Sequence, residues 1–207
     1  MAAPAAIDWK AIVADPRFSI AAGKAKYYLP VKPGTDIALL LAWMHVIVTE
    51  GLTDERFIAG RTLGFDAMRE YVRHRSPEWA APLTGIEAQT IREVARLYAT
   101  SRASMILWGM GVSQHVHGTD NARCLIALVT VTGQIGKPGS GLHPLRGQNN
   151  VQGASDAGLI PMMYPNYQRV TSKEAHDWFE NFWGMKLDDQ PGYTVVEIMH
   201  KALAPDS

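Results

Sequence analysis

Residues 103–133 read ASMILWGMGVSQHVHGTDNARCLIALVTVTG. The apolar run over residues 103–108 stops at Gly109, which is typical of a short buried strand that ends in a glycine loop. The segment over residues 119–133 is long enough for a helix, and Gly133 is a natural C-terminal end for it. A strand, a short glycine loop and a helix in succession are the unit from which α/β folds with parallel sheets are built.

The chain before this unit continues the same pattern. A short strand is predicted from Lys10 to Ala14, and a second extended piece covers residues 25–36. A buried helix follows up to about Glu50, with Gly51 as its stop, and either Thr35 or Asp36 is expected to cap it by accepting from its first free amides. Amphipathic helices are predicted over residues 53–62, 64–76 and 84–101.

The composition changes after Gly133. Glycine, proline and amides dominate up to Pro165, and the run LHPLRGQNNVQGASDAG over residues 142–158 places a single arginine, Arg146, among glycines and amides. A core does not favour so many amides, and a solvated loop does not need so many glycines. We therefore expect this run to hold a polar ligand and place a domain boundary near residues 134–150. Two further helices are predicted over residues 172–184 and 194–204.

Composition limits the function classes. The chain has 207 residues, 47% of them hydrophobic, with 20 basic and 20 acidic side chains, which argues against a broad nucleic-acid-binding face. The one cysteine, Cys124, excludes a disulfide within the chain and a site held by several cysteines, and it is expected to be a core thiol. No apolar run is long enough for a membrane span, and the first residues do not resemble a signal peptide. A cytoplasmic location is expected.

Three loops follow strands or open helices, at what we expect to be the strand ends of one sheet. They are Asp15-Pro16-Arg17, the turn over residues 33–36, and the loop that runs from Gly109 to Gln114. Ligands of open α/β sheets bind beyond the carboxyl ends of the strands, and helix starts favour phosphate. Each loop alone is more often an ordinary turn, so together they favour a nucleotide-like ligand only modestly.

Six stretches also resemble a known family. They are VADPR, VKPGTDIALL, HVIVTEGL, ILWGMGVSQHVHGTDNAR, TGQIGKPGSGLHPLRGQNNVQGASDAG and YPNYQ. In this order they resemble the catalytic (alpha) subunit of molybdenum-dependent formate dehydrogenases, within the molybdopterin oxidoreductases. The resemblance extends from about Lys10 to the last predicted helix, and LRGQNNVQGA is its most specific part.

The resemblance implies a cofactor and a substrate. The cofactor is a bis-molybdopterin guanine dinucleotide with molybdenum or tungsten, and the reaction is the reversible oxidation of formate to carbon dioxide. Arg146 resembles the arginine that sits beside the metal and orients formate. The implied cofactor contacts are Asp15, Arg17, Gly34, Thr35, Asp36, Met110, Gln114 and Gln148.

The resemblance also implies that the chain is a central fragment. Residues 1–147 would be the later part of an incomplete Rossmann-like parallel-sheet domain that binds the pterin nucleotide. Residues 148–207 would re-enter a second α/β domain of the formate dehydrogenase/DMSO reductase fold.

The parts of the enzyme expected elsewhere are the metal-ligating cysteine or selenocysteine, the iron–sulfur cluster region and the C-terminal domain, so this chain holds no metal ligand and is expected to be inactive alone. The implied partners are formate, the rest of the large subunit, and iron–sulfur or NAD-linked diaphorase subunits. Two alternatives stay open at this point. One is a non-catalytic module for cofactor-nucleotide binding or assembly, and the other is an unrelated α/β nucleotide-binding protein.

Overall fold

A computed structural model describes residues 10–203 of the chain. The chain divides into two compact units, Met1–Leu145 and Arg146–Ser207. The change from one unit to the next falls inside the glycine- and amide-rich region over residues 134–150. The assignment of residues 1–147 and 148–207 to two domains of a larger protein stays a prediction.

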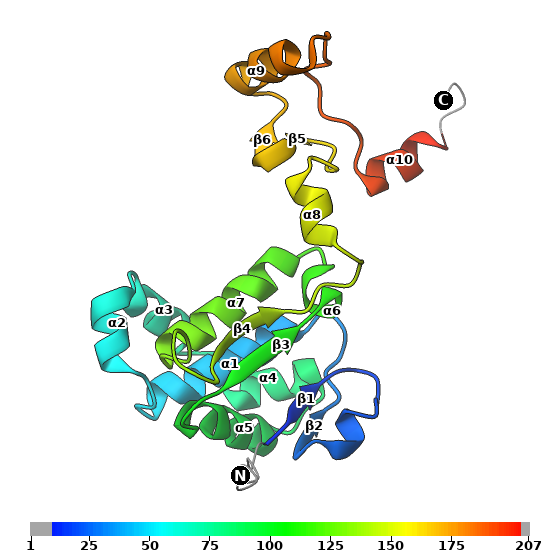
Figure 1. Cartoon of the computed structure of the whole chain (residues 1–207). Helices are drawn as coiled ribbons and strands as arrows, with labels where there is room; N and C mark the ends of the chain where they lie inside the picture. Colours follow the sequence, from blue (N-terminus) through cyan, green and yellow to red (C-terminus); the bar gives the residue numbers. More distant parts are fainter. Residues whose placement is uncertain (1–9, 204–207) are drawn as a thin grey trace, which may run out of the picture. The chain divides into compact units, whose positions relative to one another are not determined.

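The strands of the first unit form two parallel pairs. Strand β1 (Ile12–Ala14) pairs with β2 (Tyr27–Leu29), and β3 (Met105–Trp108) pairs with β4 (Gly141–Pro144), in the register Met105 to Gly141 (Figure 1). The parallel α/β pattern predicted from the sequence is confirmed. The single sheet that we expected is not formed, because among the described residues no ladder of hydrogen bonds joins β1 or β2 to β3 or β4.

Helices make up most of the first unit. The predicted helices are all present, and α4 and α6 are additions. The bounds are α1 (Asp36–Thr49), α2 (Glu55–Arg61), α3 (Phe65–Val72), α4 (Pro77–Thr84), α5 (Ala88–Thr100), α6 (Met110–Ser113), α7 (Gly118–Val131) and the short 3₁₀ helix Ala22–Lys24. No helix among residues 10–203 is long and apolar enough to cross a bilayer.

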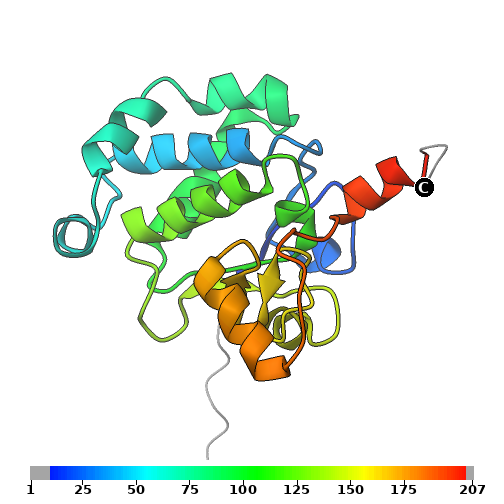
Figure 2. The same ribbon diagram turned by 90° about the horizontal axis from the view of Figure 1, so that it is seen from above.

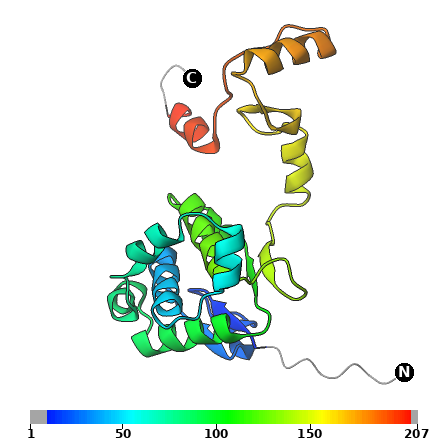
Figure 3. The ribbon, with the colours of Figure 1, turned by 90° about the vertical axis from the view of Figure 1, so that its left-hand side faces the viewer.

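Helix α1 lies at the centre of the first unit. Apolar side chains occur all around it, so neighbours cover it on several sides rather than along one stripe. It packs against α4, α5 and α7, as the view from above shows (Figure 2) and the side view repeats (Figure 3). Two clusters of buried side chains result, one between α1 and α7 around Met44 and Leu128, and one between α1 and α5 around Leu39 and Ile91.

The sequence predicted the C-terminal end of α1 correctly but not the cap at its N-terminal end. Gly51 adopts a positive φ of 66°, which fits its predicted role as the stop after the helix. The predicted side-chain cap at the start is wrong, because Thr35 occupies the N-cap position without a capping hydrogen bond. Its hydroxyl instead donates to the carbonyl oxygen of Lys32 at 2.7 Å, which tightens the preceding turn.

The second unit is smaller. It contains α8 (Val151–Asp156), a hairpin of β5 (Met163–Tyr164) and β6 (Gln168–Arg169) around the 3₁₀ turn η2 (Pro165–Tyr167), and the helices α9 (Lys173–Trp183) and α10 (Val195–Lys201). The two helices predicted here are present. Tyr164, Val170, Ala175 and Phe179 form its small core. Trp178 and Phe182, two further aromatic side chains of α9, stack on each other and are exposed.

A buried glutamine joins three parts of the first unit. The side chain of Gln134, which is 1% exposed, follows α7 and accepts from the backbone N–H of Ser104 at 2.9 Å through Oε1. Its Nε2 donates to the carbonyl oxygen of Ser101 at 2.9 Å. The link between α5 and β3 therefore depends on one amide side chain for two of its backbone hydrogen bonds.

Replacing this amide should destabilise the fold. We expect Gln134→Leu to lower the free energy of unfolding by about 1–3 kcal/mol, because it leaves a backbone donor and a backbone acceptor without partners. Urea unfolding measures the change. The matched control is Gln89→Leu, at an exposed position of α5, where a change within about 0.5 kcal/mol is expected. Equal effects in the two variants would contradict the role given to Gln134.

Candidate functional site

The loop after β1 carries the first two predicted contact residues. The backbone N–H of Asp15 donates to the carbonyl oxygen of Leu29 at 3.2 Å, which places the loop at the carboxyl end of β1 beside the end of β2. The Asp15 carboxylate accepts from the backbone N–H of Arg17 at 2.7 Å. This small turn fixes the backbone and leaves the Arg17 guanidinium exposed.

The turn before α1 carries Gly34, Thr35 and Asp36. Gly34 has a positive φ of 81°, and a β-carbon added to it would meet no other atom within 4 Å. The turn thus needs glycine for its backbone, and the side of the turn where a side chain would project is open. Asp36 begins α1, whose first amides carry the partial positive charge of a helix start.

The loop after β3 carries Met110 and Gln114. Met110 begins the single-turn helix α6, and the backbone N–H of Gln114 donates to the carbonyl oxygen of Met110 at 2.8 Å. Gln114 is exposed. Gly109 and Gly111 each face open space where a β-carbon would sit. The loop therefore presents bare backbone on its open side.

These three loops suit a large polar ligand with phosphate and purine parts. They offer carboxylates at Asp15 and Asp36, a guanidinium at Arg17 and an amide at Gln114, which are the groups that recognise a guanine edge, hydroxyls and phosphates. The open glycine faces allow a ligand to lie close to the backbone. The residues present thus fit the predicted pterin guanine dinucleotide in their chemistry. Contact between these loop residues and the cofactor remains a prediction.

Arg146 lies at the start of the second unit, in an unusual conformation. Its φ of 61° lies in the left-handed region, which is uncommon for a long side chain. Its Nη2 donates to Oε1 of Gln152, on α8, at 3.0 Å. Arg146 is exposed, and so is Gln148. Asn150, at the start of α8, is also left-handed, with a φ of 50°.

A second residue of α8, Asp156, interacts with Tyr167 of the turn η2. The Asp156 carboxylate forms a hydrogen bond with the hydroxyl of Tyr167, and this bond is the main reason that the pKa of Tyr167 is raised. Partial burial and the negative charge of Asp156 raise that pKa further, and the positive charge of Arg146 opposes the shift. The sequence analysis did not identify this pairing of Asp156 with Tyr167. The stretch YPNYQ, quoted for the resemblance, was the signal that could have identified it.

The remaining polar candidates have structural surroundings. The Nδ1–H of His45 donates to the carbonyl oxygen of Val72, 2.9 Å away, so this histidine on α1 has a structural partner. His115 contacts the carbonyl oxygen of Gly111 at 2.6 Å, and His117 precedes α7. Cys124 is half-buried against the core, and burial raises the pKa of its thiol. Within residues 10–203 no three histidine, cysteine or acidic side chains gather as metal ligands would.

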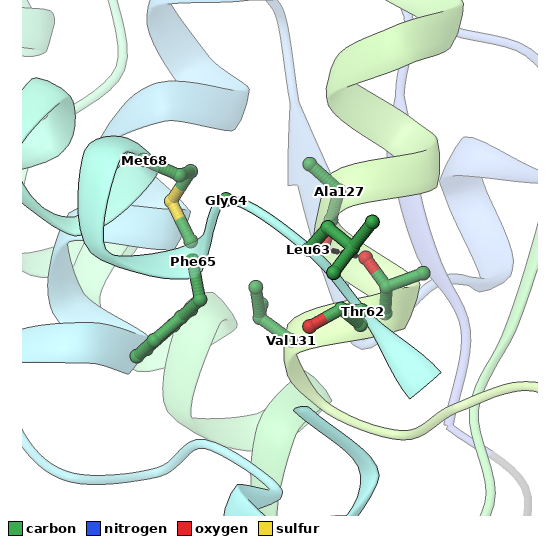
Figure 4. Close-up of a pocket in the computed structure, with 8 residues that line it drawn as sticks. Thr62, Leu63, Gly64, Phe65, Met68, Ala127 and Val131 are labelled. Atoms are coloured by element: carbon green, nitrogen blue, oxygen red, sulfur yellow. Dashed lines mark hydrogen bonds between the residues drawn. The ribbon is translucent and has the colours of Figure 1, made fainter. Parts of the chain in front are cut away.

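A small surface hollow lies between the loop after α2 and helix α7. Figure 4 shows Phe65 and Met68 on one side of it and Leu63, Thr62 and Ala127 on the other. Its lining includes threonine hydroxyls but no titratable side chain. The hollow therefore offers no titratable acid or base. The three loops of the first unit and, separately, the Arg146 segment of the second unit remain the candidate functional regions.

Sequence comparison finds relatives over most of the chain. Formate dehydrogenase H of Escherichia coli is 44% identical over 194 residues, which cover 93% of this chain and 27% of that protein. The alpha subunit of an F420-dependent formate dehydrogenase from Methanocaldococcus jannaschii is 40% identical over 193 residues, 93% of this chain and 28% of that one. A nitrate reductase of Synechocystis is 33% identical over 192 residues, 91% of this chain and 27% of its own length. The chain thus spans little more than a quarter of these relatives.

Structure comparison also finds a similar protein. Acetylene hydratase from Pelobacter acetylenicus superposes with a TM-score of 0.61 at 31% identity, over 63% of this chain and 18% of that one. The likeness supports the α/β architecture predicted from the sequence. The family model for molybdopterin oxidoreductases matches residues 3–204. The chain therefore belongs to the molybdopterin oxidoreductase family.

Proposed function

We propose that this chain is a section of the large subunit of a formate dehydrogenase, which oxidises formate reversibly to carbon dioxide. The observation that carries the proposal is the placement of Arg146, an exposed guanidinium held in a left-handed backbone by an amide partner. The identity to proteins named formate dehydrogenase, 44% and 40%, supports the substrate. Family membership alone does not identify the substrate, because the similar proteins include ones named nitrate reductase and acetylene hydratase.

Arg146 is chemically suited to hold formate. A guanidinium has five N–H donors in a planar fork, and one side of that fork binds a carboxylate through two charge-assisted hydrogen bonds. The hydrogen bond to Gln152 occupies one donor on Nη2 of Arg146, so the fork retains donors for an anion. A carboxylate gripped in this way keeps its C–H bond directed away from the arginine. Formate then loses a proton and two electrons to become carbon dioxide.

We propose that the cofactor is a bis-molybdopterin guanine dinucleotide with molybdenum or tungsten. When bound, it would take up the two electrons of the reaction. In the first unit, Asp15, Arg17, Gly34, Thr35 and Asp36 would hold the guanosine and phosphates of one pterin nucleotide, with Met110 and Gln114 as further contacts. In the second unit, Gln148 would hydrogen-bond the pterin with its exposed amide.

The proposed partners follow from the length of the relatives. Since the chain matches 27–28% of the two formate dehydrogenases, the rest of such a large subunit would supply the metal ligand, the iron–sulfur cluster and the C-terminal domain. Iron–sulfur or NAD-linked diaphorase subunits would carry the electrons onward. Residues 1–147 and 148–207 would then be segments of two neighbouring domains.

The proposed dependence on the larger subunit can be tested directly. We expect the 207-residue chain expressed alone to show no formate-dependent reduction of a dye, because electron uptake requires the loaded metal site. The same assay on a large subunit that contains this sequence should show turnover. Turnover by the isolated chain would contradict the proposal.

Replacing the proposed formate ligand should impair catalysis without loss of cofactor. In the intact enzyme we expect Arg146→Lys to lower kcat/KM for formate by at least about tenfold, because lysine replaces two directed, charge-assisted hydrogen bonds by a point charge. Steady-state kinetics and metal analysis measure the two quantities. Arg169→Lys, on the exposed strand β6, is the matched control and should leave both unchanged. Unchanged formate kinetics in Arg146→Lys would remove Arg146 from the site.

The open glycine of the β3 loop provides a test of cofactor binding. At Gly109 the φ is −130° and a β-carbon meets nothing within 4 Å, so Gly109→Val should leave folding intact. A cofactor lying against this backbone would collide with the new side chain, so we expect metal and guanine nucleotide content to fall severalfold. Gly60→Val, at an equally open glycine on α2, should keep full content. Normal cofactor content in Gly109→Val would exclude this loop from the site.

A further inference from the structure

Helix α8 supports two side chains that both come from strained backbone. Arg146 and Tyr167 have φ values of 61° and 56°, and in the described chain they are the positive-φ residues that are neither glycine nor asparagine. Left-handed backbone is unfavourable for such side chains unless the surroundings fix it. Each of the two is bonded to α8, Arg146 to Gln152 and Tyr167 to Asp156.

The two supporting residues share one face of the helix. Gln152 and Asp156 are four positions apart, which places them one above the other on an α-helix. The turn η2, which carries Tyr167, packs against α8. The helix therefore presents a neutral acceptor to the guanidinium, and its carboxylate forms a hydrogen bond with a phenol hydroxyl.

We infer that Gln152 is a positioning residue for Arg146, one that orients the guanidinium without neutralising it. This inference rests on the proposed function, in which Arg146 holds the carboxylate of formate. A carboxamide oxygen accepts a hydrogen bond but carries no net charge. Arg146 thus keeps its full positive charge for an incoming monovalent anion while one edge of its fork is held in place.

The chemistry at position 152 distinguishes orientation from simple structural support. Glutamate has the shape of glutamine, retains an acceptor oxygen and forms a stronger, charge-assisted bond to arginine. For structural support alone, glutamate would be at least as good as glutamine and better than leucine. For an anion site the order is reversed, since a carboxylate at this position competes with formate for the guanidinium.

Few other charges surround Gln152. The charged or titratable groups of α8 and of η2, which packs against it, are Asp156 and Tyr167, and Arg146 reaches it from the preceding loop. The Asp156 carboxylate lies one turn along α8 from Gln152 and interacts with the Tyr167 hydroxyl. Placing a second carboxylate on this face changes the charge opposite Arg146 directly, and formate affinity reports that change.

The test compares Gln152→Glu and Gln152→Leu in the intact, cofactor-loaded enzyme. We expect Gln152→Glu to raise both the KM for formate and the Kd from titration calorimetry by about tenfold, equivalent to ~1.4 kcal/mol, with kcat little changed. Gln152→Leu should raise them by a smaller factor, because it removes orientation but leaves the charge of Arg146 free. Gln190→Glu, the same charge change at an exposed position, should match the wild type.

Several outcomes would overturn the inference. These are a formate Kd near the wild-type value in Gln152→Glu, a larger defect in Gln152→Leu than in Gln152→Glu, or a fall in kcat with KM unchanged. Metal content shows whether Gln152→Glu or Gln152→Leu has lost cofactor. If one of them has, the formate Kd of the other tests the inference, and it should rise above the wild-type value.

The Arg146→Lys background separates this inference from the proposed function. In that background, Gln152→Glu should raise the KM and Kd for formate by a smaller factor than it does with Arg146 present, if the two side chains act together. A formate defect in Arg146→Lys combined with normal Gln152 variants would reject only the positioning role. Normal formate kinetics in Arg146→Lys itself would reject the proposed function.

Discussion

The burial of α1 on several sides is the constraint on which the first unit depends. Eight of its fourteen residues are buried, among them Leu39, Met44 and Ile47, so contacts along one face alone cannot cover them. Each such side chain contributes about 1.5–3 kcal/mol when fully removed from water. The helices α4, α5 and α7 must therefore gather around α1. Its N-terminus, with the turn from Gly34 to Asp36, is thereby held in a fixed place.

The sequence predicted the elements whose signals are local. The strand at Met105–Trp108 and the helix that follows it were clear because apolar runs of the right length end at Gly109 and Gly133. The amphipathic α5 was clear because Ile91, Val94 and Tyr98 recur at helical spacing, and all three are buried. In the candidate site, the loops after β1 and β3 and before α1 were located correctly, since each follows or precedes such an element. The roles of their side chains remain proposals.

Other features were missed, some because they depend on contacts distant in sequence and some because their local signals conflict. Strand β4 reads Gly-Leu-His-Pro, which carries little strand signal, and it exists because its backbone pairs with β3. Helix α4 contains Pro82, which lacks an amide, yet Ser76 caps it and Pro77 suits its first turn. Helix α8 has no apolar periodicity, so the sequence did not predict the helix. The hydrogen bond that Arg146 donates to Gln152 was therefore not predicted either. The capping role of Thr35 failed because its hydroxyl found a nearer partner in Lys32.

The two compact units carry different parts of the proposed chemistry. The first offers carboxylates, open glycines and a helix start, features that suit a nucleotide and do not depend on the substrate. The second offers a guanidinium whose hydrogen-bond partner on α8, Gln152, is an uncharged amide. Family members that share the cofactor but act on different substrates would be expected to keep the first set and to vary the second. On this reasoning, the proposed binding of formate would depend on the net charge that α8 presents to Arg146 as well as on the arginine itself.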